Sequence, residues 1–66
     1  MSELHFIVYE RDGNWQYSSR GEVTAHFASR QEAVDAAIEA ARETGVEHAR
    51  VIVQQADMKQ ETVWQP

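Results

Sequence analysis

Apolar residues recur three or four positions apart between residues 29 and 45, which is the spacing of one face of an α-helix. The stripe consists of Val34, Ala37, Ile38 and Ala41. Ser29 is a good N-cap, Glu32 can complete a capping box with it, and Gly45 suits the left-handed position that ends a helix. These signals predict one amphipathic helix over Ser29–Thr44.

The predicted helix is lined mostly with alanine, so it can approach its partner surface closely but contributes little bulk to a core. The large apolar side chains lie elsewhere in the chain. They are Phe6, Trp15, Tyr17, Phe27 and Trp64. Aromatic side chains dominate small cores, so we expect the rest of the chain to supply the bulk beneath the helix.

Five segments outside the helix have the composition or the alternation of β-strands. They are residues 4–10, 15–18, about 23–27, 46–55 and 61–64. The order β-β-β-α-β-β predicts an α+β fold in a single domain over residues 1–66, with the helix on one face of a small antiparallel or mixed sheet. A right-handed crossover sets the fourth strand parallel to the first. The fifth strand pairs back within the chain or exchanges with a second copy.

Two turns decide which side chains of the first three strands face the helix. Asp12-Gly13 is the sequence of a two-residue type I′ turn. Counting back from that turn places both Trp15 and Tyr17 on the helix side of the sheet.

The turn around Gly21 has two interpretations. A three-residue loop over residues 19–21 turns the apolar side chains of the third strand toward the helix. Those side chains are Val23, Ala25 and Phe27. A two-residue loop turns Thr24 and His26 inward instead, because a one-residue slip moves every side chain to the opposite face. Burial of the apolar side chains favours the longer loop.

The face of the sheet away from the helix carries more apolar residues than the solvent face of an antiparallel sheet usually does. The residues assigned to this face are His5, Ile7, Tyr9, Thr24, His26 and Ile52, with Val63 as a further candidate. Apolar patches of this kind commonly mark interaction sites. The alternative is scattered surface hydrophobics, which are ordinary on soluble proteins.

Length and composition favour self-association. A domain of 66 residues lies near the lower limit for independent folding, and this one has no cysteine for a disulfide. Its three histidines fit no zinc-site spacing, so no metal is predicted. Oligomerisation is the remaining common support. The leading hypothesis is therefore a non-enzymatic protein-interaction module that forms a homodimer through the outer sheet face or an edge strand.

The net charge of −5 argues against nucleic acid or an anionic membrane as the default partner. No hydrophobic leader or bilayer-spanning run is visible, so we expect a cytoplasmic protein. Weak nucleic-acid binding is the alternative function, through arginines beside aromatic rings. These are Arg11, Arg20, Arg30 and Arg50 beside Trp15 and Tyr17. The competing interpretation, that both rings belong to the core, is favoured.

No catalytic residue and no cofactor is predicted. Glu10 and Asp12 flank a turn and have no nucleophile or buried neighbour to tune them as an acid–base pair. A chain of 66 residues has little room for a concave active site unless a second subunit completes it. We therefore predict a protein that is not an enzyme.

Several motifs along the chain resemble those of a bacterial family. They are Leu4–Val8, Asp12-Gly13 before Trp15, Gly21, Ala25–Phe27 leading into Ser29, and the alanine helix from Glu32 to Arg42. On these positions the chain resembles domain of unknown function 2188 and, more distantly, the YegP-like domains. The resemblance implies an α+β fold with a curved sheet under a helix, and it implies no catalytic residue. The chain departs from the family pattern at Asp57-Met58-Lys59, where that pattern suggests a glycine.

Overall fold

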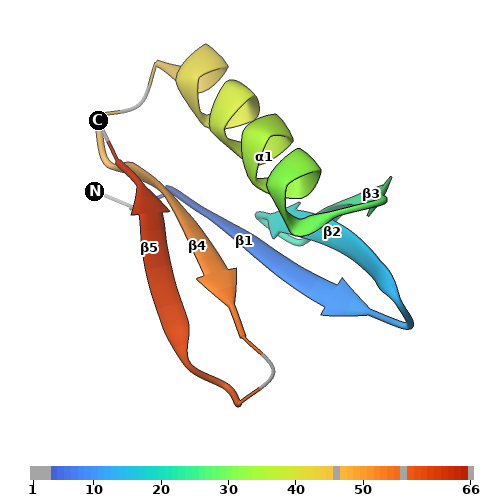
Figure 1. Ribbon diagram of the computed structural model, residues 1–66. Helices are drawn as coiled ribbons and strands as arrows, with labels where there is room; N and C mark the ends of the chain where they lie inside the picture. The colour runs from blue at the N-terminus through green and yellow to red at the C-terminus, as the bar shows by residue number, and fades with distance from the viewer. Residues whose placement is uncertain (1–3, 46, 56, 66) are drawn as a thin grey trace.

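A computed structural model describes residues 4–45, 47–55 and 57–65 of the chain. Within them, five strands form one sheet and one helix lies across a single face of it (Figure 1). The elements are β1 (Leu4–Arg11), β2 (Asn14–Ser19), β3 (Glu22–Phe27), α1 (Arg30–Thr44), β4 (Ala49–Gln54) and β5 (Gln60–Trp64). The predicted α+β class and the order β-β-β-α-β-β are confirmed. Val46, at the start of the predicted fourth strand, lies outside the described residues.

The strand order across the sheet is β3-β2-β1-β4-β5. β1 and β4 are parallel, as the predicted crossover requires, and the other neighbouring pairs are antiparallel. β5 pairs with β4 of the same chain, which is the first of the two arrangements that the sequence left open. β1, the first strand in sequence, therefore lies in the centre of the sheet.

Helix α1 begins and ends at the predicted signals. The Ser29 hydroxyl accepts a hydrogen bond from the Glu32 backbone N–H at 3.2 Å, and the Glu32 carboxylate accepts one from the Ala28 N–H at 3.0 Å. Gly45 is left-handed with a φ of 67°, and its N–H donates to the carbonyl of Arg42. Local side chains and a glycine thus satisfy groups that a helix terminus leaves without partners.

The core lies between α1 and the face of the sheet that the helix covers, which we call the inner face. Its buried members are Leu4, Phe6, Val8, Ala33, Val34, Ala37, Ala41, Ala49, Val51 and Val53. The rings of Trp15, Tyr17 and Phe27 are half-buried against this cluster. The Tyr17 ring centroid lies 6.0 Å from that of Phe6 and 6.0 Å from that of Phe27. The prediction that Trp15 and Tyr17 belong to the core is confirmed.

The β1–β2 hairpin has the predicted register. Asp12 and Gly13 both have positive φ, at 54° and 82°, as a type I′ turn requires. Val8 lies opposite Tyr17 in the pairing. Residues opposite each other share a face of the sheet, so the tyrosine ring joins the buried valine on the inner face.

The predicted loop of the β2–β3 hairpin is wrong. Arg20 and Gly21 have φ of 54° and 81° and close a two-residue turn instead of the predicted three-residue loop. Val23 and Ala25 consequently face away from the helix rather than toward it. Local backbone conformation at the turn therefore sets this register, and not the burial of the two apolar side chains.

The shorter loop also corrects the assignment of Thr24 to the face away from the helix. Thr24 lies opposite Tyr17, and so it belongs to the inner face. A bulge in the β2–β3 pairing then sets Phe27 opposite Trp15. Phe27 faces the core, as expected, because the bulge restores its direction at the end of the strand.

Both edge strands are short and irregular. β3 has six residues and β5 has five, and each has a register shift in its pairing with the neighbouring strand. Bulges bend and twist an edge strand, which hinders continuous pairing with another chain. The edges of this sheet are therefore poorly suited to extending it.

Candidate functional site

Five uncharged side chains form a row across the outer face, the face of the sheet opposite the helix. This outer row consists of Val23, Ser18, Ile7, Ile52 and Thr62, one from each of β3, β2, β1, β4 and β5. Each member lies opposite the next in the strand register, and opposing residues share a face. The outer row therefore spans the full width of the sheet.

The centre of the outer row is closely packed. Ile52 is only 9% exposed although no helix covers it, and Ile7 beside it is half-buried. Val23, at the edge, is 54% exposed. The outer row thus offers less open apolar surface at its centre than the sequence suggests.

Polar side chains flank the outer row. Tyr9 lies opposite Gln16, whose side-chain amide donates a hydrogen bond to the phenol oxygen at 2.6 Å. On the other side of the row, His5 lies opposite Arg50. The strand residues that face outward in the described part of the chain include Arg11 and Arg50 but no carboxylate, although the net charge is −5. The acidic side chains lie on the helix, in turns and on the inner face.

The structure brings most of the predicted interaction residues together. His5, Ile7, Tyr9 and Ile52 share the outer face on the two central strands. His26 is exposed on β3 and borders a shallow groove with Val23 and Ala25. Thr24 lies on the inner face instead. Val63 is the extra residue at the bulge in β5 and packs against the core.

A cleft opens where β1 and β4 separate. Their pairing ends at Val8 opposite Val53. Beyond this point β1 leads to β2 on one side and β4 leads to β5 on the other, and Figure 1 shows the two hairpins diverging. Adjacent strands that separate in this way leave a crevice between their ends, and ligand sites are concave.

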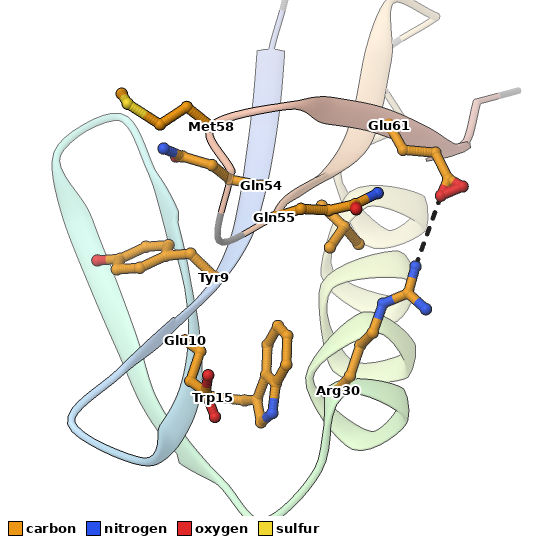
Figure 2. Close-up of a pocket in the computed structure, with 9 residues that line it drawn as sticks. Tyr9, Glu10, Trp15, Arg30, Gln54, Gln55, Met58 and Glu61 are labelled. Atoms are coloured by element: carbon orange, nitrogen blue, oxygen red, sulfur yellow. Dashed lines mark ion pairs between the residues drawn. The ribbon is translucent and has the colours of Figure 1, made fainter.

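The cleft has a volume of about 580 Å³, within the range of small-ligand sites. Its apolar lining comes from Trp15, Val53 and Met58. Its polar lining comes from Tyr9, Glu10, Arg30, Gln54, Gln55 and Glu61. Figure 2 shows the Trp15 ring between the β1–β2 hairpin and the start of α1, with Gln54, Gln55 and Met58 across from it.

The cleft carries a small excess of negative charge. Arg30 Nη2 lies 3.7 Å from Glu61 Oε1, and both side chains are 51% exposed, so this ion pair is loose. Glu10 lies opposite Trp15 on the same face, and no ion pair forms to it among the described residues. Two carboxylates and one guanidinium therefore share the cleft.

The sequence does not reveal this cleft. It groups Glu10 with Asp12 in a solvated turn, whereas the structure turns the Glu10 side chain toward Trp15 and leaves Asp12 beside the outer groove. The available signal is the parallel pairing of the first and fourth strands combined with hairpins that leave on opposite sides. That signal depends on the strand order, which the sequence leaves open.

The three histidines lie on separate elements. His5 is on β1, His26 is on β3 and His48 precedes β4. Over residues 4–45, 47–55 and 57–65, no three His, Cys, Asp or Glu side chains are grouped so that they could hold a metal ion. None of the helical structure in those ranges is long and apolar enough to cross a lipid bilayer.

The structure places two of the arginines of the alternative nucleic-acid platform near its rings and two away from them. Arg30 lines the cleft with Trp15, and Arg20 borders a groove with Tyr17. Arg11 and Arg50 lie on the outer face. Trp15 and Tyr17 pack beneath the helix on the inner face. The rings and the outer arginines therefore cannot act together on one strand of nucleic acid.

The sequence profile of one protein family matches residues 5–62, from β1 into β5. That family is DUF2188, described as an uncharacterized protein conserved in bacteria. The chain belongs to the DUF2188 family. The resemblance inferred from the sequence motifs is thereby confirmed, and the match includes the strands that form both the outer row and the cleft of this DUF2188 domain. No curated protein and no solved structure matches the chain.

Proposed function

We propose that this DUF2188 domain is a non-enzymatic protein-interaction module that self-associates as a homodimer through the outer face of its sheet. The observation that carries the proposal is the outer row, which crosses all five described strands without a charged side chain. An uncharged strip of this kind can pack against its own copy, because a two-fold axis brings the same patch of both chains together.

The charges around the outer row support a face-to-face contact. No outward-facing carboxylate lies on the described strands, so packing this face would not strip water from an acidic group. Arg11 and Arg50 lie on opposite sides of the row. Arginine is enriched at protein interfaces, where its long side chain can keep the guanidinium at the wet rim.

The irregular edges of the sheet favour a face-to-face contact over an edge contact. The bulges in β3 and β5 make edge pairing the less suitable route to a dimer.

Sedimentation equilibrium at micromolar concentration tests the proposal. We expect a species of twice the 7.6 kDa chain mass. Ile7→Lys places a charge at the centre of the outer row and should shift the protein toward monomer with little loss of helix content. Gln31→Lys adds the same charge on the exposed side of α1 and should leave the dimer intact. A monomeric wild-type protein overturns the proposal.

Weak binding of single-stranded nucleic acid remains the second candidate. The outer face favours nucleic-acid binding because Tyr9 on the central strand shares this face with arginines and glutamines. None of the described strands turns a carboxylate to this face. Single-stranded RNA stacks on aromatic side chains of open sheet faces in this way. This second hypothesis predicts binding at low salt that falls steeply as salt is added and that is lost in Tyr9→Ala. No anisotropy change of a labelled oligonucleotide at low salt eliminates it.

A further inference from the structure

We propose that the cleft between β1 and β4 binds an arginine side chain presented by a partner polypeptide. The cleft lies beside the start of α1 and shares no residue with the outer row that carries the self-association proposal. The two proposals are independent, and a monomeric protein would leave this one intact.

The charge of the cleft favours a cation as the ligand. Glu10 and Glu61 outnumber Arg30, and Arg30 already lies beside Glu61. Glu10 is exposed, and in the described part of the chain it has no ion pair. The net charge of −5 on the whole chain adds a long-range attraction for a basic partner.

Among cations, the side chains that line the cleft favour a guanidinium group. Glu10 and Trp15 lie directly opposite on neighbouring strands, where Cβ atoms are about 5 Å apart. A guanidinium can therefore place its flat face on the indole and its N–H donors on the carboxylate. The side-chain carbonyls of Gln54 and Gln55 across the cleft offer further acceptors. An ammonium has no planar face for the ring and no fork of donors.

Met58 supplies a contact for the apolar stem of an arginine. Its side chain lines the cleft and is 80% exposed, and apart from Val23 it is the only large hydrophobic side chain that is exposed in the described residues. Arginine carries three methylene groups that pack along apolar surfaces while its charged head is satisfied elsewhere. The flexible thioether of methionine adapts well to such a chain.

Other ligand classes fit the cleft less well. An anion would meet two carboxylates, and the single arginine that could hold it is paired. Nucleic acid is disfavoured for the same reason, since phosphates require a basic surface. The described residues bring no three metal-binding side chains together, so the lining suits an organic cation better than a metal ion.

The test is a titration of the full-length, isotope-labelled protein followed by NMR. The probes are the capped peptide Gly-Gly-Arg-Gly-Gly and the same peptide with citrulline, which keeps the shape of arginine and removes its charge. We expect the arginine peptide to shift the Trp15 indole and the Gln54 and Gln55 side-chain amides in a saturable manner. The shifts should weaken as salt is added. A lysine peptide should bind more weakly than the arginine peptide.

Two matched variants locate the site. Glu10→Gln should weaken binding of the arginine peptide about fivefold, because it removes the charged acceptor beside the indole. Glu39→Gln makes the same charge change on the exposed side of α1, away from the cleft lining, and should leave the affinity unchanged. Both side chains are exposed, so neither change threatens the fold.

Three results overturn the proposal. The first is equal shifts with the arginine and citrulline peptides, and the second is equal affinity for arginine and lysine. The third is equal loss of affinity in Glu10→Gln and Glu39→Gln, which would assign the effect to the net charge of the chain. The peptide comparison uses the wild-type protein and so decides the matter even if a variant fails to fold.

Discussion

Ile7 of β1 and Ile52 of β4 lie directly opposite each other on the outer face, in the parallel pairing that joins the first strand to the strand after the helix. Ile52 is 9% exposed without a helix above it. Its neighbours within the sheet therefore provide its burial. The centre of the outer face is therefore closely packed and uncharged, which suits contact with a broad surface rather than with an inserted side chain.

Substitutions at Val8 and Val23 test the register of the sheet. Val8 is fully buried beneath α1, and Val23 is 54% exposed on the outer face. Val8→Ala should lower the free energy of unfolding by about 2 kcal/mol, because it loses buried methyl groups and leaves a cavity. Val23→Ala should change the free energy of unfolding by less than about 0.5 kcal/mol. Urea denaturation at a protein concentration where the chain is monomeric measures both, and equal losses would contradict the register.

Arg20 tests the two-residue turn between β2 and β3. Its φ of 54° is left-handed, a conformation that asparagine tolerates better than arginine does. Arg20→Asn creates the Asn-Gly sequence of a type I′ turn and should raise the free energy of unfolding by about 0.5 kcal/mol. Ser19→Asn, one residue before the turn, should give no such gain in thermal denaturation. Unchanged stability in Arg20→Asn would contradict the turn.

Ser29 tests the start of α1. Its hydroxyl accepts from the Glu32 N–H at 3.2 Å, so Ser29→Ala leaves that donor without its partner. The free energy of unfolding should fall by about 1 kcal/mol. Ser29→Asp retains an acceptor and should keep most of the stability, as followed by circular dichroism during denaturation. Identical behaviour of the alanine and aspartate variants would show that the cap contributes nothing.

Arg30 and Glu61 test the link between α1 and β5. Their charged atoms are 3.7 Å apart and both side chains are half exposed. A double-mutant cycle with Arg30→Gln and Glu61→Gln should give a coupling energy below about 0.5 kcal/mol that falls further in high salt. A coupling energy above about 1.5 kcal/mol would mean that the pair is shielded from water and anchors the helix to the edge strand.

The two hairpins differ in how well the sequence predicts them. At Asp12-Gly13 the turn residues and the burial of apolar side chains point to the same register, and that register is observed. At Arg20-Gly21 both signals favour the longer loop, because arginine is an unusual residue for a left-handed position and Val23 favours burial, yet the shorter loop is observed. The backbone takes the tight turn, and a bulge near the end of β3 then restores the direction of Phe27.

The helix and the core could be predicted because their signals are local or periodic. Ser29, Glu32 and Gly45 act within one turn of the helix ends, and the alanine stripe marks the buried side of α1. The cleft could not be predicted in the same way. It exists because β1 and β4 separate after Val8 and Val53, and this geometry depends on strands that are far apart in sequence.

The central position of β1 has a consequence for synthesis on the ribosome. Within this domain β1 is made before its parallel partner, which begins only at Ala49. A nascent chain that has completed α1 still presents one long side of β1 unpaired, with Leu4, Phe6 and Val8 only partly covered. Unpaired apolar strands attract other chains. Stalled or truncated products that lack β4 should therefore aggregate far more readily than the complete domain.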